Sequence, residues 1–388
     1  MQIRICEDEM KKILLEDCCE ILDSQRVPIT ATNRAEGPYP YYGANGVQDY
    51  VDDYIFDDEL VLLAEDGGNF GSKTKPIAYR VSGKCWVNNH AHVIKPKNRI
   101  DVDFLCYSLM FYNTDGLVNG ATRQKLTQAT MRKMLIPDLS KEQQLDIVNQ
   151  LNRIVEIRNL RLKEIQKLDE LIKARFVELF GDPISNPLGW PVKKLDDISL
   201  LITNGNTPKG GSDNYTNEGI VFLRSQNIWR NKIDLDDVAY IDASTHADMA
   251  KSSVHDKDIL ITKTGRINTE NSSLGRAALF RGADNSANIN GHVYLVRLDG
   301  TTVPEYVVAI LTGEPYRRYI RKVCVGGIDK RQINLDQIED FPIILPPVKL
   351  QEQFADFVYQ VDKSKAAVQK ALDETQLLFD SLMQEYFG

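Results

Sequence analysis

The sequence predicts an α+β protein in which two β-rich globular domains alternate with two long helices. Nearly the same segment occurs twice, as KMLIPDLSKEQQL at residues 133–145 and as IILPPVKLQEQF at residues 343–354. Each copy opens a long apolar pattern of helical spacing, which closes on LFG at 179–181 and on YFG at 386–388. A chain of 388 residues is long enough for two to three domains. One unit, a domain followed by a helix, is therefore predicted to occur twice with pseudo-two-fold symmetry.

The first domain, residues 1–137, is predicted to be built of short strands between loops. A Lys-Lys pair opens an acidic and apolar run, and a stretch rich in glycine, proline and tyrosine follows it. Two strand-like runs and a glycine-to-basic loop come next. These features read KKILLEDCCEIL (11–22), EGPYPYYGANG (36–46), DDELVLLAEDGGNFG (57–71), VNNHAHVI (87–94) and GATRQKLT (120–127). Short alternating strands of this kind indicate a mixed, β-rich domain.

The first long helix is predicted within residues 138–183. Between Leu145 and Leu179 the apolar residues recur in steps of three, four and seven, which is the stripe of a coiled coil. Ser140 followed by Gln143 resembles a capping box at its start, and Gly181 with Pro183 ends it. About 40 helical residues would extend roughly 60 Å.

The second domain, residues 184–347, repeats the features of the first in the same order. Its runs are KKLDDISLLI (193–202), NGNTPKGGSDNYTNEG (204–219), DKDILITKTG (256–265), NINGHVYLV (288–296) and GGIDKRQINL (326–335). The second long helix, 348–388, carries an apolar stripe like that of the first. Since a lone helix with one apolar seam would be marginal in water, the two seams are predicted to bury each other. The alternative is that each helix packs on a partner protein.

Composition limits the class of protein. The 47 basic and 55 acidic residues give a net charge of −8, which by itself argues mildly against nucleic acid, although residues 193–340 are nearly neutral and permit a local basic face. No apolar run is long enough for a membrane span, and MQIRICEDEMKK lacks the apolar core of a secretory signal, so we expect a cytoplasmic protein without a membrane partner. The six scattered cysteines lack a C-x-x-C pattern and are predicted to be free or buried thiols.

No catalytic or metal site is predicted. Cys85, His90 and His92 lie close in sequence, but the second copy keeps only His292, so a structural or hydrogen-bonding role is favoured over a metal. DKDILITK at 256–263 imitates a metal-nuclease core only loosely, and the first copy has no matching lysine. The sequence contains neither a phosphate-binding G-x-x-x-x-G-K-[ST] loop nor an Asn-Pro-Pro-aromatic run for adenine methylation.

Basic residues beside glycine are the feature that accumulates in both copies. Lysine and arginine neutralise phosphates, while arginine, asparagine and glutamine bond base edges, and glycine lets a backbone approach closely. An ordinary solvated surface is the alternative for any one cluster, but recurrence at equivalent places favours DNA. The clusters of the second copy are YRRYIRKVCVGGIDKRQ (316–332), TKTGRINTENSSLGR (262–276) and RSQNIWRNK (224–232).

The order of these parts resembles the specificity subunit (S, HsdS) of type I restriction–modification systems. The resemblance covers the whole chain and rests on the two LP…EQ helix starts, the two FG ends and the junction FGDPISNPLGWPVKKLDDI at 180–198. It implies target recognition domains at 1–137 and 184–347, each reading half of a bipartite double-stranded DNA target. The helices at 138–183 and 348–388 would pair antiparallel as a spacer that sets the gap.

The resemblance also implies partners rather than catalysis. Two methyltransferase subunits would bind S-adenosylmethionine and methylate adenine, with two restriction subunits as optional partners, while this chain would hold no cofactor and no metal. Type II enzymes of type I-like architecture share the fold and stay open as an alternative. A protein-only coiled-coil adaptor and an enzyme with divergent motifs also stay open.

Matching positions predict the DNA contacts. In the first domain they are Tyr42, Gly43, Asn45, Lys73, Lys75, Arg123, Gln124 and Lys125. In the second they are Arg224, Gln226, Asn227, Lys263, Thr264, Gly265, Arg266, Arg276, Lys330, Arg331 and Gln332.

Overall fold

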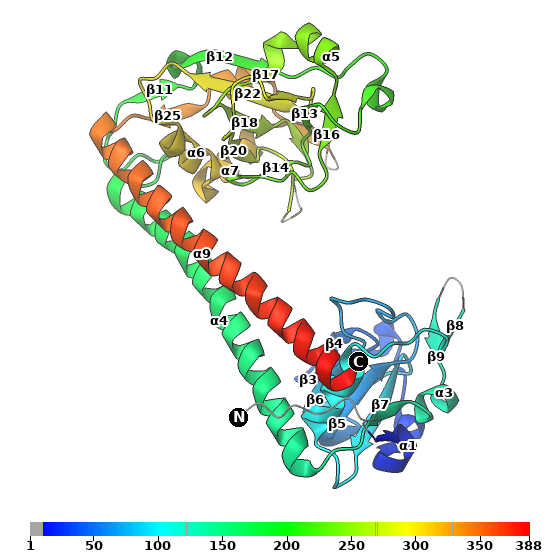
Figure 1. The fold of residues 1–388 in the computed structure, drawn as a ribbon. Helices are drawn as coiled ribbons and strands as arrows, with labels where there is room; N and C mark the ends of the chain where they lie inside the picture. Colours follow the sequence, from blue (N-terminus) through cyan, green and yellow to red (C-terminus); the bar gives the residue numbers. More distant parts are fainter. Residues whose placement is uncertain (1–10, 121–122, 268, 270, 328–329) are drawn as a thin grey trace. The chain divides into compact units, whose positions relative to one another are not determined.

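The computed structural model describes residues 11–120, 123–267, 269, 271–327 and 330–388, which form two compact units (Figure 1). Unit 1 comprises Met1–Lys163 with Gln369–Gly388, and unit 2 comprises Glu164–Val368. Each unit holds one β-rich domain together with part of both long helices. The predicted α+β class is confirmed. The predicted boundaries between domains and helices stay predictions.

A six-stranded sheet forms the centre of unit 1. Its strand order is β2-β7-β5-β6-β3-β4, and the central strand β5 runs antiparallel to both neighbours. β3 runs parallel to β6. The apolar run Leu60–Ala64 of β5 is fully buried, and α2 packs on β5 and β6. The bounds are β2 Cys19–Ile21, β3 Tyr39–Gly43, β4 Gly46–Val51, β5 Phe56–Ala64, β6 Ala78–Val87, β7 Ala91–Pro96 and α2 Val102–Met110.

Two small strand pairs complete unit 1. β1 (Lys12–Leu14) pairs with β10 (Leu135–Pro137) and so joins the start of the domain to its end. β8 (Val118–Asn119) pairs with β9 (Lys125–Leu126) in a short hairpin. The short helices are α1 Leu15–Cys18 and α3 Gln128–Arg132, with single 3-10 turns at Asp23–Gln25 and Ala31–Asn33.

Unit 2 contains two four-stranded sheets. One has the order β12-β22-β18-β20 and the other β16-β13-β21-β17. Their bounds are β12 Ser199–Asn204, β13 Ile220–Leu223, β16 Ala239–Ile241, β17 Ser253–Val254, β18 Ile259–Thr262, β20 Ala277–Leu279, β21 Ala287–Ile289 and β22 Val293–Leu298. Three smaller sheets accompany them. β14 (Ile228–Trp229) pairs with β15 (Lys232–Ile233), and β11 (Val192–Lys194) pairs with β25 (Pro342–Ile344). β24 (Arg331–Gln332) pairs with both β19 (Thr264–Gly265) and β23 (Val325–Gly326). The helices are α5 Ala243–Asp248, α6 Pro304–Thr312, α7 Glu314–Val323 and α8 Leu335–Glu339.

The internal repeat is visible in the backbone. The β11–β25 pair of unit 2 matches the β1–β10 pair of unit 1, and β13 runs parallel to β21 as β3 does to β6. Asn88 Oδ1 accepts the His90 N–H at 2.8 Å, and Asn290 Oδ1 accepts the His292 N–H at 3.0 Å. The predicted repetition is therefore confirmed down to single turns.

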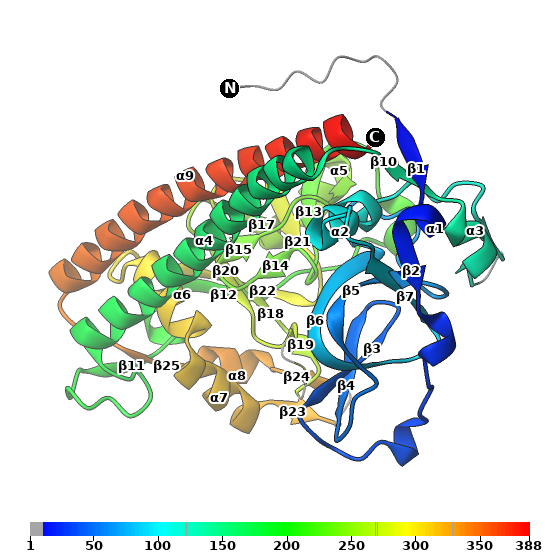
Figure 2. The ribbon, with the colours of Figure 1, turned by 90° about the horizontal axis from the view of Figure 1, so that it is seen from below.

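The long helices α4 (Lys141–Phe180) and α9 (Val348–Phe387) pair antiparallel (Figures 1 and 2). Within unit 1 the Tyr386 hydroxyl lies 3.1 Å from Gln150 Oε1. Within unit 2 Lys365 Nζ lies 2.6 Å from Asp169 Oδ1. The predicted capping box is present, because Ser140 N–H donates to Gln143 Oε1 at 3.0 Å and Gln143 N–H donates to Ser140 Oγ at 3.3 Å.

A buried glutamine attaches the start of each long helix to its domain. Gln144 Oε1 accepts the Asp101 N–H at 2.7 Å, and Gln351 Oε1 accepts the Val303 N–H at 3.0 Å. Asp101 and Val303 are the N-cap residues of the equivalent helices α2 and α6. Each amide also donates to carbonyls, Gln144 to Leu139 O at 2.9 Å and Gln351 to Pro346 O at 2.8 Å. The repeated glutamine therefore has a docking role that the sequence pattern did not indicate.

Aromatic side chains bury the helix ends within each unit. In unit 2, Phe176 and Phe180 of α4, Tyr306 of α6 and Phe354 of α9 pack with ring centroids 4.8 to 6.0 Å apart. In unit 1, Phe104 of α2 packs on Phe387 of α9 with centroids 5.5 Å apart.

Among the described residues, no helix has the length and apolarity needed to cross a membrane.

A buried polar network lies beside the sheet of unit 1. His92 is fully buried, with Nδ1 2.6 Å from Asp23 Oδ2 and Nε2 2.9 Å from Leu126 O. Arg26 Nη1 donates to Glu65 Oε2 at 2.7 Å. Asp23, Glu65 and His92 lie close enough to share a metal ion, but protein partners already occupy their ligand atoms. This saturation supports the hydrogen-bonding role predicted for His92. Burial raises the pKa of Cys85 to about 12, which disfavours the thiolate that a metal requires.

Replacing Gln351 by leucine should destabilise unit 2. The Val303 N–H would be left without its buried acceptor, and such a group costs about 1–3 kcal/mol. Urea unfolding of Gln351→Leu and of the exposed control Gln353→Leu would measure the difference. Equal unfolding free energies for the two variants would contradict a docking role.

Acid should weaken unit 1 through Asp23. Burial alone would raise the pKa of this carboxyl, but the bond and charge of His92, with the Val93 N–H and Arg26, bring it below the ordinary value. The stabilisation is therefore complete above the unfolded pKa and is lost as the pH falls through the lower folded pKa. Asp23→Asn should cost about 3 kcal/mol at pH 7 and progressively less in acid. Hydrogen exchange of β7 against pH would measure this, with the exposed Asp115→Asn as control; a cost independent of pH would refute it.

Candidate nucleic-acid interface

The predicted contact residues fall mainly in two equivalent loop clusters, one in each unit. In unit 1, the Glu65 N–H donates to His90 O at 2.9 Å and the Leu126 N–H to Glu65 O at 2.7 Å. In unit 2, the Lys263 N–H donates to His292 O at 2.9 Å and the Ile333 N–H to Lys263 O at 3.0 Å. The same three positions are bonded in the same way. Strand ends, turn and hairpin are thus brought together identically in both domains.

The hairpins of the two clusters depend on glycine. Gly120 and Gly326 adopt φ angles of +100° and +112°, which side-chain-bearing residues rarely adopt. A Cβ on either would meet the carbonyl oxygen of Arg123 at 2.5 Å or of Lys330 at 2.6 Å. The β8–β9 hairpin displays Arg123, Gln124 and Lys125 in this way, and the β23–β24 hairpin displays Lys330, Arg331 and Gln332.

In the first cluster, exposed basic side chains form ion pairs with carboxylates. The side chains of Arg123 and Lys125 are 60% and 50% exposed. Arg123 Nη2 donates to Asp66 Oδ1 at 2.8 Å, and Lys125 Nζ lies 3.0 Å from Glu65 Oε1. His90 Nδ1 lies 2.7 Å from the same Asp66 oxygen. Sequence reasoning missed Glu65, Asp66 and His90 as members of this cluster, since only the fold brings them beside the hairpin.

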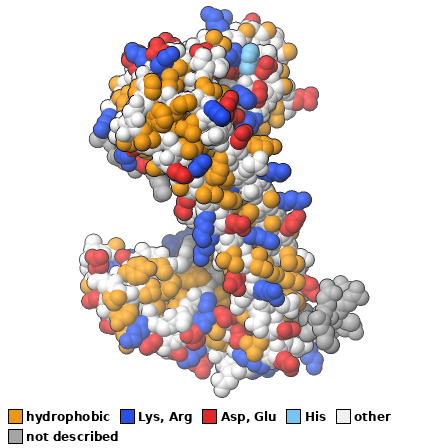
Figure 3. All heavy atoms as spheres, turned by 90° about the vertical axis from the view of Figure 1, so that its left-hand side faces the viewer, with side chains coloured by type: hydrophobic (Ala, Val, Ile, Leu, Met, Phe, Trp, Pro, Cys, Tyr) orange, Lys and Arg blue, Asp and Glu red, His pale blue; other side chains and the backbone are white. Residues whose placement is uncertain are grey.

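The other predicted residues of unit 1 differ in accessibility. Exposed Asn45 joins the cluster through its Nδ2, which donates to Gly67 O at 3.0 Å. Tyr42 is half-buried against Tyr79, with centroids 5.8 Å apart, and Gly43 is buried. Lys73 and Lys75 are exposed on the loop after β5. Figure 3 shows that basic and acidic side chains are intermixed on the face of the molecule that it draws.

In the second cluster, β19 brings Thr264 opposite Gln332 and Gly265 opposite Arg331. Lys263 Nζ lies 5.5 Å from the centroid of the Tyr294 ring, a cation–π geometry. Arg266 and Lys330 are exposed, whereas Arg331 is half-buried with Nη1 3.4 Å from Cys324 O. Gln332 Nε2 donates to Asn334 Oδ1 at 2.8 Å.

In unit 2, two predicted contact side chains lie in the interior instead. Arg276 is 8% exposed, its Nε donates to Ser272 O at 3.0 Å, and its guanidinium lies 3.9 Å from the Trp229 ring. Burial, with a smaller contribution from Arg230, lowers the pKa of Arg276. Asn227 is 2% exposed and donates to Asp234 O and Asp237 O. We correct both to loop supports, because their polar atoms are already used inside the domain.

Arg224 and Gln226 stand on the loop that Asn227 supports. Arg224 Nη2 donates to Asp237 O at 2.9 Å, and Gln226 Nε2 donates to Asp237 Oδ2 at 2.7 Å. Gln226 is exposed and Arg224 is half-buried. These two side chains remain accessible beside the second domain's loops, each restrained by the same aspartate.

A basic helix distinguishes unit 2 from unit 1. α7 ends next to the β23–β24 hairpin and carries exposed Arg318, Arg321 and Lys322. In unit 1 the chain passes from α2 to β8 through a short turn that contains Asp115. The electrostatic character of the two clusters therefore differs.

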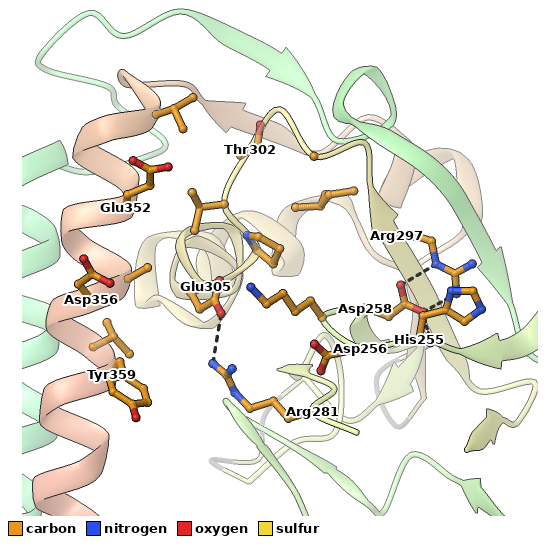
Figure 4. Close-up of a pocket in the computed structure, with 18 of the residues that line it drawn as sticks. His255, Asp256, Asp258, Arg281, Arg297, Thr302, Glu305, Glu352, Asp356 and Tyr359 are labelled. Atoms are coloured by element: carbon orange, nitrogen blue, oxygen red, sulfur yellow. Dashed lines mark hydrogen bonds and ion pairs between the residues drawn. The ribbon is translucent and has the colours of Figure 1, made fainter. Parts of the chain in front are cut away.

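A cavity of about 700 Å³ in unit 2 contains none of the predicted residues (Figure 4). It is lined by α6, the start of α9 and the turn before β18. Its arginines are paired, Arg281 with Glu305 at 3.4 Å and Arg297 with Asp258 at 2.7 Å. Asp256, Glu352 and Asp356 add further negative charge to its lining. This cavity is therefore unsuited to a phosphate backbone, in contrast to the loop clusters.

Comparison with known proteins gives the same internal division. The family model described as "Type I restriction modification DNA specificity domain" matches residues 7–170 and again 187–375. A protein of Haemophilus influenzae named as a type I restriction enzyme specificity subunit is 27% identical over 386 residues, 96% of this chain and 92% of that protein. The MjaX specificity subunit of Methanocaldococcus jannaschii is 25% identical over 202 residues, 52% of this chain and 46% of that protein.

Solved structures show the same fold. The S subunit of a type I restriction–modification system from M. genitalium has a TM-score of 0.58 at 14% identity, with 100% of this chain and 98% of that chain covered. A chain from a study of type I complex assembly has a TM-score of 0.55 at 15% identity, with 97% of each chain covered. Since the family model matches most of the sequence, once in each repeat, the chain belongs to the type I restriction–modification DNA specificity family and carries its domain twice.

Proposed function

We propose that each β-rich domain of this specificity subunit reads one half of a bipartite DNA target through its loop cluster. The observation that carries the proposal is the recurrence of one glycine-dependent basic hairpin, held by the same backbone bonds, in both domains. The chain itself is non-catalytic, and sequence recognition is its contribution to a type I system.

In the first domain, the β8–β9 hairpin supplies the base-reading side chains. Arg123 and Gln124 have the donor and acceptor groups that bond base edges in the major groove. Asn45 stands beside them through Gly67. Lys73, Lys75 and Lys125 contact phosphates, which fix the position of the protein on the duplex without reading sequence. The bonds of Arg123 and Lys125 to Asp66 and Glu65 hold these cations in place before DNA arrives.

In the second domain, the reading surface is formed by β19 and β24. Arg331 and Gln332 offer bidentate groups, while Lys263, Arg266 and Lys330 neutralise phosphates. Thr264 and Gly265 form the backbone platform opposite them. Arg224 and Gln226 extend the surface. α7 adds phosphate contacts through Arg318, Arg321 and Lys322, so the second domain binds the backbone more strongly than the first.

The partners follow from the family. DNA and a methyltransferase are the partners of a type I specificity subunit, and we propose two methyltransferase subunits because the repeat offers each of them an equivalent surface. These subunits bind S-adenosylmethionine and methylate adenine at N6, whereas this chain holds no cofactor. Two restriction subunits join the complex when cleavage is required, and the DNA substrate implies action in the cytoplasm.

Methylation mapping tests the proposal as a whole. Cells that co-express this chain with its partner methyltransferase should acquire a new motif of two short half-sites with a fixed gap and N6-methyladenine in each. A stable purified complex that produces no such motif would reject the proposal in favour of a protein-only adaptor.

Arg331→Ala should relax one base position in the second half-site. Loss of a bidentate contact reduces discrimination against the wrong base by about 1–3 kcal/mol. Competition binding of the assembled complex to duplexes that vary at each position would measure this. Arg281→Ala is the matched control, since that exposed arginine lies outside the proposed interface. An unchanged motif in Arg331→Ala would remove Arg331 from the set of reading residues.

Removal of the α7 cations should lower the salt dependence of binding without altering the motif. Each phosphate contact contributes about −0.9 to the slope of log K against log salt. The triple variant Arg318→Ala, Arg321→Ala, Lys322→Ala should therefore bind with a shallower slope. A double control, Lys193→Ala with Lys251→Ala, removes exposed charge from the same unit outside the interface. Equal slopes in the triple variant and the wild type would exclude α7 from the interface.

A further inference from the structure

Two buried residues at the same strand position reach the base of the two hairpins. His92 on β7 comes two residues after His90, which precedes the strand. Tyr294 on β22 likewise comes two residues after His292, which precedes that strand. His92 stands opposite Leu63 of β5, and Tyr294 stands opposite Ile261 of β18. Two residues further along these partner strands lie Glu65 and Lys263, the equivalent positions of the two clusters. His92 and Tyr294 are therefore structural counterparts, although their side chains are chemically unrelated.

The two side chains bond backbone carbonyls that occupy equivalent positions at the base of the two hairpins. His92 Nε2 lies 2.9 Å from Leu126 O, and the Tyr294 hydroxyl donates to Ile333 O at 3.0 Å. Leu126 is the last residue of β9 and Ile333 directly follows β24, and both are fully buried. His92 and Tyr294 are themselves 0% and 1% exposed. Neither touches the surface on which DNA would lie.

These bonds are strong constraints because of where they lie. When a buried carbonyl loses its hydrogen-bond donor, the folded state is destabilised by the full desolvation cost of that carbonyl, since water cannot replace the donor. The constrained residue follows directly on Lys125 in unit 1 and on Gln332 in unit 2. A shift at this base would be transmitted to side chains that must meet base edges within hydrogen-bond distance.

We propose that His92 and Tyr294 are positioning residues for sequence recognition, each setting the reading hairpin of its own domain and hence its own half-site. The inference rests on the proposed function. Imidazole in one copy and phenol in the other serve the same purpose, because each brings a donor to the same depth below the hairpin. Loss of the donor loosens discrimination in one half-site and leaves phosphate contacts in place.

Tyr294→Phe tests the second domain, because it removes the hydroxyl and keeps the ring. Tyr306→Phe is the matched control: this tyrosine is also fully buried in unit 2, and its hydroxyl donates to the Ile344 carbonyl at 2.9 Å, away from the hairpin. Each variant is co-expressed with the partner methyltransferase, its methylation motif is mapped, and the purified complex is titrated with specific and nonspecific duplexes.

Tyr294→Phe should relax the second half-site and leave the first unchanged. The ratio of specific to nonspecific affinity should fall roughly tenfold, which corresponds to one ordinary hydrogen bond. The salt dependence of nonspecific binding should stay as in the wild type. Tyr306→Phe should keep the wild-type motif.

Two variants of His92 test the first domain by loss and rescue. Asparagine places an amide near the position of Nδ1 and so keeps a partner for Asp23 while it removes the donor to Leu126. Glutamine places an amide near the position of Nε2 and so keeps that donor. His92→Asn should relax the first half-site alone, and His92→Gln should retain its discrimination.

Three results would overturn the inference: an unchanged motif in Tyr294→Phe, equal relaxation in Tyr306→Phe, or simultaneous relaxation of both half-sites. Failure of the proposed function looks different, because the wild-type complex would then show no bipartite motif at all, and the positioning role would fall with it.

Discussion

One buried glutamine attaches each long helix to its domain, and the geometry of the unit around it follows from that attachment. Gln144 and Gln351 each bond the N-cap of the helix that follows the central strands of their domain, Asp101 in unit 1 and Val303 in unit 2. The amide bonds also to the turn that leads into its own long helix. The glutamine amide thereby fixes where each long helix starts and in which direction it runs, because an amide cannot be buried without cost unless all its hydrogen bonds are made. Aromatic packing at the helix ends then completes each unit.

The two domains share the backbone arrangement of the loop cluster but differ in the side chains that it carries. Glu65 corresponds to Lys263, and His92 corresponds to Tyr294, yet the bonds that join strand, turn and hairpin are the same. Because the constant bonds are made mainly by the main chain, the side chains above them are free to differ. Such an arrangement suits a protein that reads two different sequences with one fold.

The acidic composition is compatible with a DNA interface because charge acts locally. Asp66 and Glu65 lie within bonding distance of Arg123 and Lys125, so the first cluster is restrained and partly neutralised. The second cluster has Lys263 where the first has Glu65, and α7 adds exposed cations next to it. Screening confines exposed charges to about 10 Å at moderate salt, so the total of −8 says little about either surface.

The repeat, the two long helices, the capping box of the first of them and the loops that carry glycine beside basic residues could all be predicted from the amino-acid sequence. Periodicity, punctuation and recurrence are local properties of a chain. The sequence also indicated that His92 is structural. Which polar residues face outward depends instead on tertiary contacts. Asn227 is interior although Gln226 beside it is exposed, and Arg276 is interior although the loop before it contains the exposed Asn271. Asp66 follows β5 and His90 lies in the turn before β7, yet the two meet in the first cluster. Burial and partnership arise from contacts between distant segments, and the equivalence of a histidine with a tyrosine can be recognised only from the common carbonyl position that each one bonds.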